Sequence, residues 1–95
     1  MSTEDSDNFR ISLMIRSARS ILGLSLKELA DTLDVGASTI GKWENNELTL
    51  KASTFMKMNK YFESQGIYFD MLSDGELIIK VKPALVESLM SKKKK

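Results

Sequence analysis

The sequence predicts a mainly α-helical fold of four to five short helices followed by a C-terminal β-hairpin. Between residues 9 and 64 the apolar residues recur three and four positions apart, the spacing of a helix with one buried face. Residues 67–81 instead surround an Asp-Gly pair with β-forming residues, which is typical of two strands joined by a tight turn. A chain of 95 residues can bury one such core but not two, so we expect a single domain.

Composition excludes several classes of function. The chain contains no cysteine and no histidine. A disulfide framework, a zinc site of the Cys/His kind and catalysis by a Ser-His or Cys-His pair are therefore excluded. No apolar run approaches the ~20 residues that span a bilayer, and the acidic start, MSTEDSDN, is unlike a signal peptide. We expect a cytoplasmic protein that is not an enzyme, with no cofactor or metal, no membrane contact and no small-molecule ligand.

Charge is distributed unevenly along the chain. Residues 10–60 carry eight basic and five acidic residues, whereas residues 61–91 carry two basic and five acidic ones. Such a charge dipole can orient a protein on a polyanion. Scatter in a neutral protein would give a similar pattern, so charge alone does not decide. Residues 1–8 are small, polar and acidic, and we expect them to be disordered.

The first two helices have clear boundaries. The first is expected from about residue 9 to 22, on a single apolar stripe, and it ends at Gly23. Ser25 and Glu28 then have the spacing of a capping box, in which the serine hydroxyl and the glutamate each accept a backbone N–H of the other residue. The second helix should therefore begin here and run for about nine residues.

The third and fourth helices follow in the same way. Asp34 lies at the sharp turn before the third helix, because aspartate tolerates the left-handed conformation better than most residues. The third helix should turn Ile40 and Trp43 inward and end near residue 45. A fourth helix is expected at about 52–64, and Gly66 closes it.

Residues 67–82 are expected to form the hairpin. A two-residue loop, Asp74-Gly75, would pair Phe69 with Lys80 and mix charge into the apolar face. A three-residue loop that begins at Ser73, with Gly75 left-handed, gives a purely apolar face instead. That register pairs Met71 with Leu77, Phe69 with Ile79 and Ile67 with Val81, and it is our prediction. Residues 83–95 should form a short helix and a lysine tail.

A helix-turn-helix is predicted within residues 9–66, because two short helices are joined by a tight turn and the second exposes small and polar residues. The stretch IRSARSILGLSLKELADTLDVGASTIGKWENN resembles the XRE family of lambda-repressor-like DNA-binding domains. The matching pieces are Arg16 and Arg19, Leu24-Ser25, Leu29-Ala30, Val35, Ser38-Thr39-Ile40 and Trp43-Glu44. The resemblance covers residues 11 to about 65 and implies double-stranded DNA as the partner.

The third helix carries the residues that we expect to read DNA bases. Its outward face holds Ala37, Ser38, Gly41, Lys42 and Asn45. The small residues would let the backbone approach closely in a major groove about 12 Å wide, and Lys42 would reach the O6 and N7 atoms of a guanine. The resemblance implies the same role for Ala37, Ser38 and Lys42. The alternative interpretation is an ordinary surface face on a short helix.

Phosphate contacts are expected at the rim of this pair of helices. The start of the second helix, with Ser25 and Lys27, would present backbone N–H groups and the positive end of the helix dipole. The resemblance adds Thr39, Arg10 and Lys51. Ordinary solvated charge is the alternative interpretation of each basic residue.

The resemblance also implies a structural ion pair and shows departures from the family. Arg19 and Glu44 should form a partly buried salt bridge between the first helix and the end of the third. Leu26 stands where the family often has a glutamine that braces the base-reading helix. Asp34 and Asn46 replace turn glycines, which is tolerable because both residue types can be left-handed.

A single helix of this kind reads only about four or five base pairs, so we expect a homodimer on a pseudo-palindromic operator. The expected dimer contacts lie on the fourth helix and the hairpin, at Tyr61, Tyr68, Leu72 and Ile78. Two functions remain open. One is a repressor that occludes a promoter; the other is an antitoxin, because TIGKWENN, the helix at 52–64 and the hairpin also resemble HipB-type antitoxins. In that case residues 1–8 or the C-terminal residues would face a toxin protein.

Overall fold

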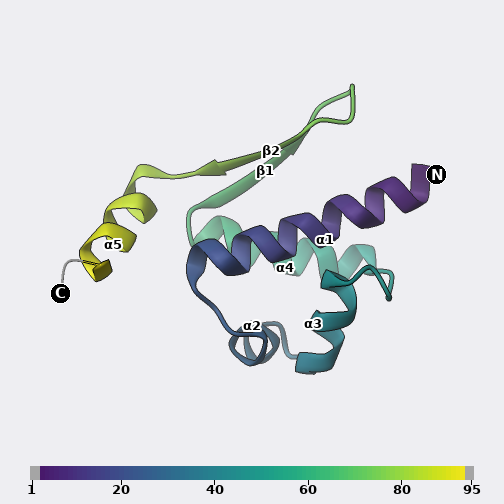
Figure 1. Cartoon of the computed structure of the whole chain (residues 1–95), viewed down its shortest axis with the longest axis horizontal. Helices are drawn as coiled ribbons and strands as arrows, with labels where there is room; N and C mark the ends of the chain where they lie inside the picture. The colour runs from purple at the N-terminus through teal and green to yellow at the C-terminus, as the bar shows by residue number, and fades with distance from the viewer. Residues whose placement is uncertain (1–2, 94–95) are drawn as a thin grey trace. The chain divides into compact units, whose positions relative to one another are not determined.

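The computed structural model describes residues 3–93, which form five helices and one two-stranded antiparallel sheet (Figure 1). The elements are α1 (Thr3–Leu22), α2 (Leu26–Leu33), α3 (Ala37–Glu44), α4 (Ala52–Ser64), β1 (Ile67–Met71), β2 (Leu77–Val81) and α5 (Pro83–Lys93). The predicted fold class, mainly helical with a C-terminal hairpin, is confirmed. Among the described residues, no helix is both long and apolar enough to cross a membrane.

The first helix begins earlier than predicted. Residues 3–8, which we expected to be disordered, form the first turns of α1, and residues 1 and 2 lie outside the described part of the chain. The structure thus describes residues 3–8 as helix, where the composition led us to expect disordered chain. The physical basis of that expectation was an acidic composition, but acidic residues are equally suited to the start of a helix, where the dipole favours negative charge.

The chain divides into two compact units between Lys57 and Met58, inside α4. The sequence predicted one domain instead, with its helix-turn-helix part ending at residue 66 and the hairpin beginning at residue 67. The unit boundary lies earlier in the chain because the second half of α4 packs with the hairpin. There the fully buried Phe62 lies edge-on to Phe69 of β1, with 6.2 Å between the ring centroids. This half of the helix therefore packs with the hairpin.

The core of the N-terminal unit is built by the apolar stripes of its helices. In this unit α3 contacts both α1 and α2 (Figure 1). The buried apolar side chains are Met14, Ile15, Ala18, Leu29, Ala30, Leu33, Ile40, Trp43 and Leu50. The predicted inward positions of Ile40 and Trp43 are thus confirmed, and they fix which side of α3 is left to face outward.

Each of the first three helices ends in the same kind of turn. Gly23, Asp34 and Asn46 are left-handed, with φ angles of 69°, 58° and 59°. After each of them, a backbone N–H donates to the carbonyl five residues earlier: Leu24 to Arg19, Val35 to Ala30 and Glu47 to Lys42. This pattern stops a helix sharply. It explains why α2 and α3 are only eight residues long and lie so close together in the chain.

The hairpin has the predicted register. Ile67 pairs with Val81, Phe69 with Ile79 and Met71 with Leu77. The Leu72 N–H donates to the Glu76 carbonyl over 2.9 Å, and Gly75 is left-handed with a φ of 91°, so the loop has three residues. The apolar face is buried at Ile67 but open towards the turn, where Met71 is 48% exposed and Ile79 is 38% exposed.

The helix α5 follows the hairpin at the end opposite to the turn (Figure 1). The Lys82 N–H donates to the Gly66 carbonyl over 2.8 Å. Gly66 has a φ of 97°, and a Cβ atom there would lie 3.0 Å from the Leu85 Cβ. A glycine is therefore required both for the backbone conformation and for this close approach. Lys92 and Lys93 belong to α5, and Lys94 and Lys95, the rest of the predicted lysine tail, lie outside the described residues.

Candidate nucleic-acid interface

The start of α2 is held by the predicted capping box. The Glu28 N–H donates to the Ser25 Oγ over 3.0 Å, and the Ser25 N–H donates to the Glu28 Oε1 over 2.9 Å. The hydrogen bond from the Ser25 backbone, helped by that from its hydroxyl, lowers the pKa of the Glu28 carboxyl. This end of α2 therefore already carries a negative charge of its own.

The outward face of α3 is solvent-exposed. Ser38, Lys42 and Asn45 are exposed, and Ala37 and Gly41 are half-buried. Ser38 and Lys42 thus face solvent from α3, Asn45 does so just after its end, and Ala37 and Gly41 lie at the half-buried edges of this face. A Cβ atom added at Gly41 would meet no other atom within 4 Å, so this surface is open to a close partner.

The predicted phosphate contacts have different surroundings. Lys51 is exposed and Thr39 is half-buried beside the predicted base-reading face, whereas Arg10 lies half-buried on α1. The Lys27 Nζ lies 3.2 Å from the Asp31 Oδ2, and the two side chains are 81% and 68% exposed. An ion pair this exposed contributes only about 0.3–0.5 kcal/mol, so it would not prevent Lys27 from turning to a phosphate.

Arg19 and Glu44 join α1 to the end of α3, as the resemblance implies. The Arg19 Nε lies 2.6 Å from the Glu44 Oε2, and the Arg19 Nη2 donates to the Glu44 Oε1 over 3.1 Å. The Arg19 Nη1 also donates to the Leu24 carbonyl just before α2. The hydrogen bond with Glu44 raises the pKa of the Arg19 guanidinium, against a smaller opposing effect of burial. One side chain thus bonds both to the last residue of α3 and to the loop before α2.

The profile of a family described as "Helix-turn-helix domain" matches residues 14–77. The matched segment runs from the middle of α1 to the first residue of β2 and covers about two thirds of the chain. The chain belongs to the helix-turn-helix domain family. No curated protein matches it in a sequence comparison. Membership of this family indicates a DNA-binding regulator, and members of the family are typically not enzymes.

Two contacts in the helix-turn-helix domain were missed from the sequence. The Ser12 Oγ of α1 donates to the Glu44 backbone carbonyl, and the Lys57 Nζ of α4 donates to the Leu33 carbonyl at the end of α2 over 2.9 Å. Both donors bind the last carbonyls of a helix, which have no partner within the helix itself. The residue types alone gave no signal, because an isolated serine or lysine in a helix usually bonds locally or to water.

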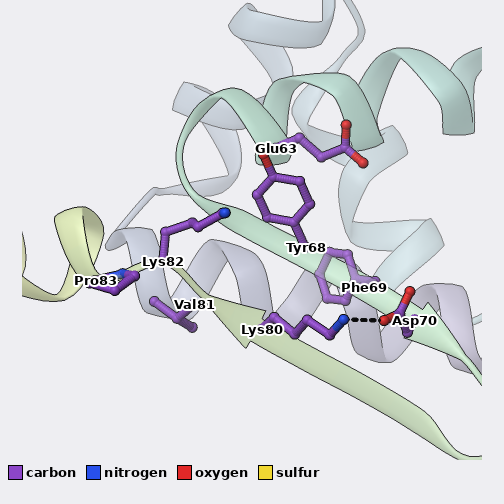
Figure 2. Close-up of a pocket in the computed structure, with 8 residues that line it drawn as sticks. All are labelled: Glu63, Tyr68, Phe69, Asp70, Lys80, Val81, Lys82 and Pro83. Carbon is purple, nitrogen blue, oxygen red and sulfur yellow. Dashed lines mark ion pairs between the residues drawn. The ribbon is translucent and has the colours of Figure 1, made fainter.

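A shallow hollow of about 350 Å³ lies on the hairpin (Figure 2). Two of its charged residues, Lys80 and Asp70, are paired with each other, and Lys82 lies over an aromatic ring. The Lys80 Nζ lies 2.5 Å from the Asp70 Oδ2, and the Lys82 Nζ lies 5.1 Å from the centre of the Tyr68 ring. No three His, Cys, Asp or Glu side chains of the described chain are grouped as a metal site would need. None of the residues predicted to contact DNA lines this hollow.

Proposed function

We propose that this protein is a dimeric transcriptional repressor of the XRE, lambda-repressor-like kind, which binds a pseudo-palindromic operator and occludes a promoter. The observation that carries the proposal is the outward face of α3, where Ser38, Lys42 and Asn45 are exposed around the open surface of Gly41. An α-helix fits one major groove, and its first residues lie closest to the base edges. The helix dipole and the exposed lysine add attraction to the DNA.

The base-reading set consists of Ala37, Ser38, Gly41, Lys42 and Asn45. Lys42 would donate to the O6 and N7 atoms of a guanine, and Ser38 can donate to or accept from several bases. Ala37 and Gly41 would contribute by their small size, because a larger side chain would hold the backbone away from the groove. Asn45 lies at the end of the same face and would read the outermost base.

Phosphate contacts would hold this helix in register. Thr39 and Lys51 are the best-supported candidates, because Thr39 lies on α3 itself and Lys51 is an exposed basic residue just before α4. Ser25 and Lys27 at the start of α2, and Arg10 on α1, complete the proposed set. The Glu28 carboxylate beside Ser25 makes the start of α2 a weaker anion site than a helix start without a capping acid.

The hairpin supports dimerisation. A two-stranded sheet is marginal alone, and this one exposes apolar side chains towards its turn: Met71, Leu72 and Ile79. Tyr61, Tyr68 and Ile78 are half-buried. We propose that Tyr61, Tyr68, Leu72 and Ile78 contact a second copy, and that Met71 and Ile79 add to this contact. Two copies would read two half-sites, which provides the specificity that one helix lacks.

The test is selection of DNA by the full chain from a random duplex library, followed by affinity measurements on the selected and on a random duplex. We expect an inverted-repeat sequence and a preference of at least about 10³-fold over random DNA. Affinity for both duplexes should fall steeply as salt rises, with a slope that reflects the number of phosphate contacts. If no DNA sequence is enriched after selection, the proposal is refuted.

An antitoxin is the second candidate, and one observation favours it. Residues 78–95 lie outside the family match, yet α5 exposes Val86 and Met90 on its surface. The proposed DNA reading by α3 does not involve these side chains, whereas a protein partner would cover them. Co-expression with the product of the adjacent gene distinguishes the two functions, because an antitoxin should relieve the growth arrest caused by its toxin and a plain repressor should not.

A further inference from the structure

We infer that Ser12 is a positioning residue for sequence reading: its hydroxyl holds the C-terminal end of the recognition helix at the angle that the DNA bases require. This inference rests on the proposed DNA-reading function of α3 and assigns that function a residue on another helix. Ser12 lies on α1 and is 3% exposed, so it does not itself face the DNA.

The carbonyls at the end of α3 have their hydrogen-bond partners outside the helix. The last four carbonyls of a helix have no partner within the helix. Three of those in α3 accept from the backbone of the following turn: Gly41 from Asn45, Trp43 from Asn46 and Lys42 from Glu47. The fourth, that of Glu44, accepts from the Ser12 hydroxyl. The backbone at the end of α3 is thus bonded to α1.

Two serines on α1, Ser17 and Ser12, form different kinds of hydrogen bond. Ser17 donates to the carbonyls of Leu13 and Met14, one turn earlier in its own helix, at 2.7 and 3.1 Å. This local bond is the usual arrangement for a serine inside a helix. Ser12 donates instead to the carbonyl of Glu44, 32 residues away. The Ser12 hydroxyl therefore joins two helices, whereas the Ser17 hydroxyl bonds only within its own helix.

Glu44 has a second contact with α1, through Arg19. Arg19 lies seven residues, or two helical turns, after Ser12 and so on the same face of α1. It holds the Glu44 carboxylate, whereas Ser12 holds the Glu44 carbonyl. A side-chain ion pair alone would let the helix rotate about the flexible glutamate side chain. The bond to the carbonyl fixes the backbone itself, and with it the directions of the neighbouring Lys42 and Asn45 side chains.

The experiment uses the full chain with Ser12→Ala, and Ser17→Ala is its matched control on the same helix. Binding to the selected operator and to a random duplex is measured at a temperature where circular dichroism shows all variants to be folded. We expect Ser12→Ala to weaken operator binding by about tenfold, the effect of one lost buried hydrogen bond, and to leave random-duplex binding within about twofold. Ser17→Ala should change neither value by more than about twofold.

A second variant, Ser12→Thr, keeps the hydroxyl and should retain most of the operator affinity. Equal losses in the alanine and threonine variants would overturn the inference, and so would a parallel loss on operator and random DNA, which indicates a purely structural role. Unchanged operator binding by Ser12→Ala would overturn the positioning role and leave the proposed function standing. If the wild-type chain selects no sequence, both the proposed function and the positioning role fail.

Discussion

The Lys57 Nζ of α4 lies 2.9 Å from the backbone carbonyl of Leu33, the last residue of α2. The last turn of α2 has no basic residue of its own, although a positive charge there stabilises a helix. Lys57 supplies that charge from a segment 24 residues further along the chain. It thereby holds the first helix of the helix-turn-helix pair in the same way that Ser12 and Arg19 hold the second.

Replacement of Lys57 by methionine should lower the free energy of unfolding by about 0.5–1 kcal/mol, because the Leu33 carbonyl loses its charged donor. Urea unfolding followed by circular dichroism measures this change. Lys60→Met, on the same helix and at an exposed position, is the control and should stay within about 0.5 kcal/mol of wild type. Equal effects of the two substitutions would show that the bond to Leu33 contributes nothing.

Replacement of Lys42 by alanine should weaken binding to the selected operator by about 1–3 kcal/mol and relax the preference at one base pair in each half-site. The reason is the loss of donors to a guanine edge. Fluorescence anisotropy on operators substituted at each position measures both effects. If binding to operator and random DNA falls by the same factor, Lys42 contacts a phosphate and does not read a base.

Replacement of Gly41 by alanine separates stability from DNA binding. A Cβ atom has room in the free protein, and alanine in a helix is more stable than glycine by about 0.5–1 kcal/mol. Thermal unfolding should therefore occur at a higher temperature. Operator binding should nevertheless weaken by about tenfold, because the added methyl group holds the helix away from the bases. A more stable variant with undiminished affinity would mean that α3 does not approach the DNA at Gly41.

The capping box predicts a dependence of stability on pH. The pKa of Glu28 is lowered in the folded state by its hydrogen bonds to Ser25, relative to its ordinary value of 4.5. A lowered folded-state pKa contributes stability that is present above the ordinary value and is lost as the pH falls through the lowered one. Wild type should be more stable than Glu28→Gln near neutral pH, and the difference should shrink in acid. A difference that stays constant from about pH 7 to about pH 3 would contradict this role.

The dimer proposal is tested by a charge placed on the hairpin. Ile79→Lys introduces a cation into the exposed apolar patch of the sheet, and it should shift the chain from dimer to monomer in sedimentation equilibrium at micromolar concentration. Val86→Lys, a similar change at an exposed position on α5, should leave the dimer intact. Wild-type protein that sediments as a monomer would refute the proposed dimer directly.

The sequence by itself determined the features that depend on neighbours along the chain. The capping box at Ser25 and Glu28, the left-handed turns at Asp34 and Asn46 and the hairpin register around Gly75 all follow from local backbone preferences. The outward face of α3 also follows, because the helical period and two large apolar residues decide which side is buried. Composition led us to expect disordered chain at residues 3–8, but an acidic stretch is equally suitable for a helix start.

Only the tertiary structure decided which helix ends are held and by what. The bonds from Ser12 to Glu44 and from Lys57 to Leu33 join residues 32 and 24 positions apart, and no local pattern marks either donor. The division of the chain inside α4 was likewise decided by the contact of Phe62 with Phe69. The physical reason is that local preferences set the ends and faces of each element, whereas a long-range hydrogen bond depends on how finished helices pack.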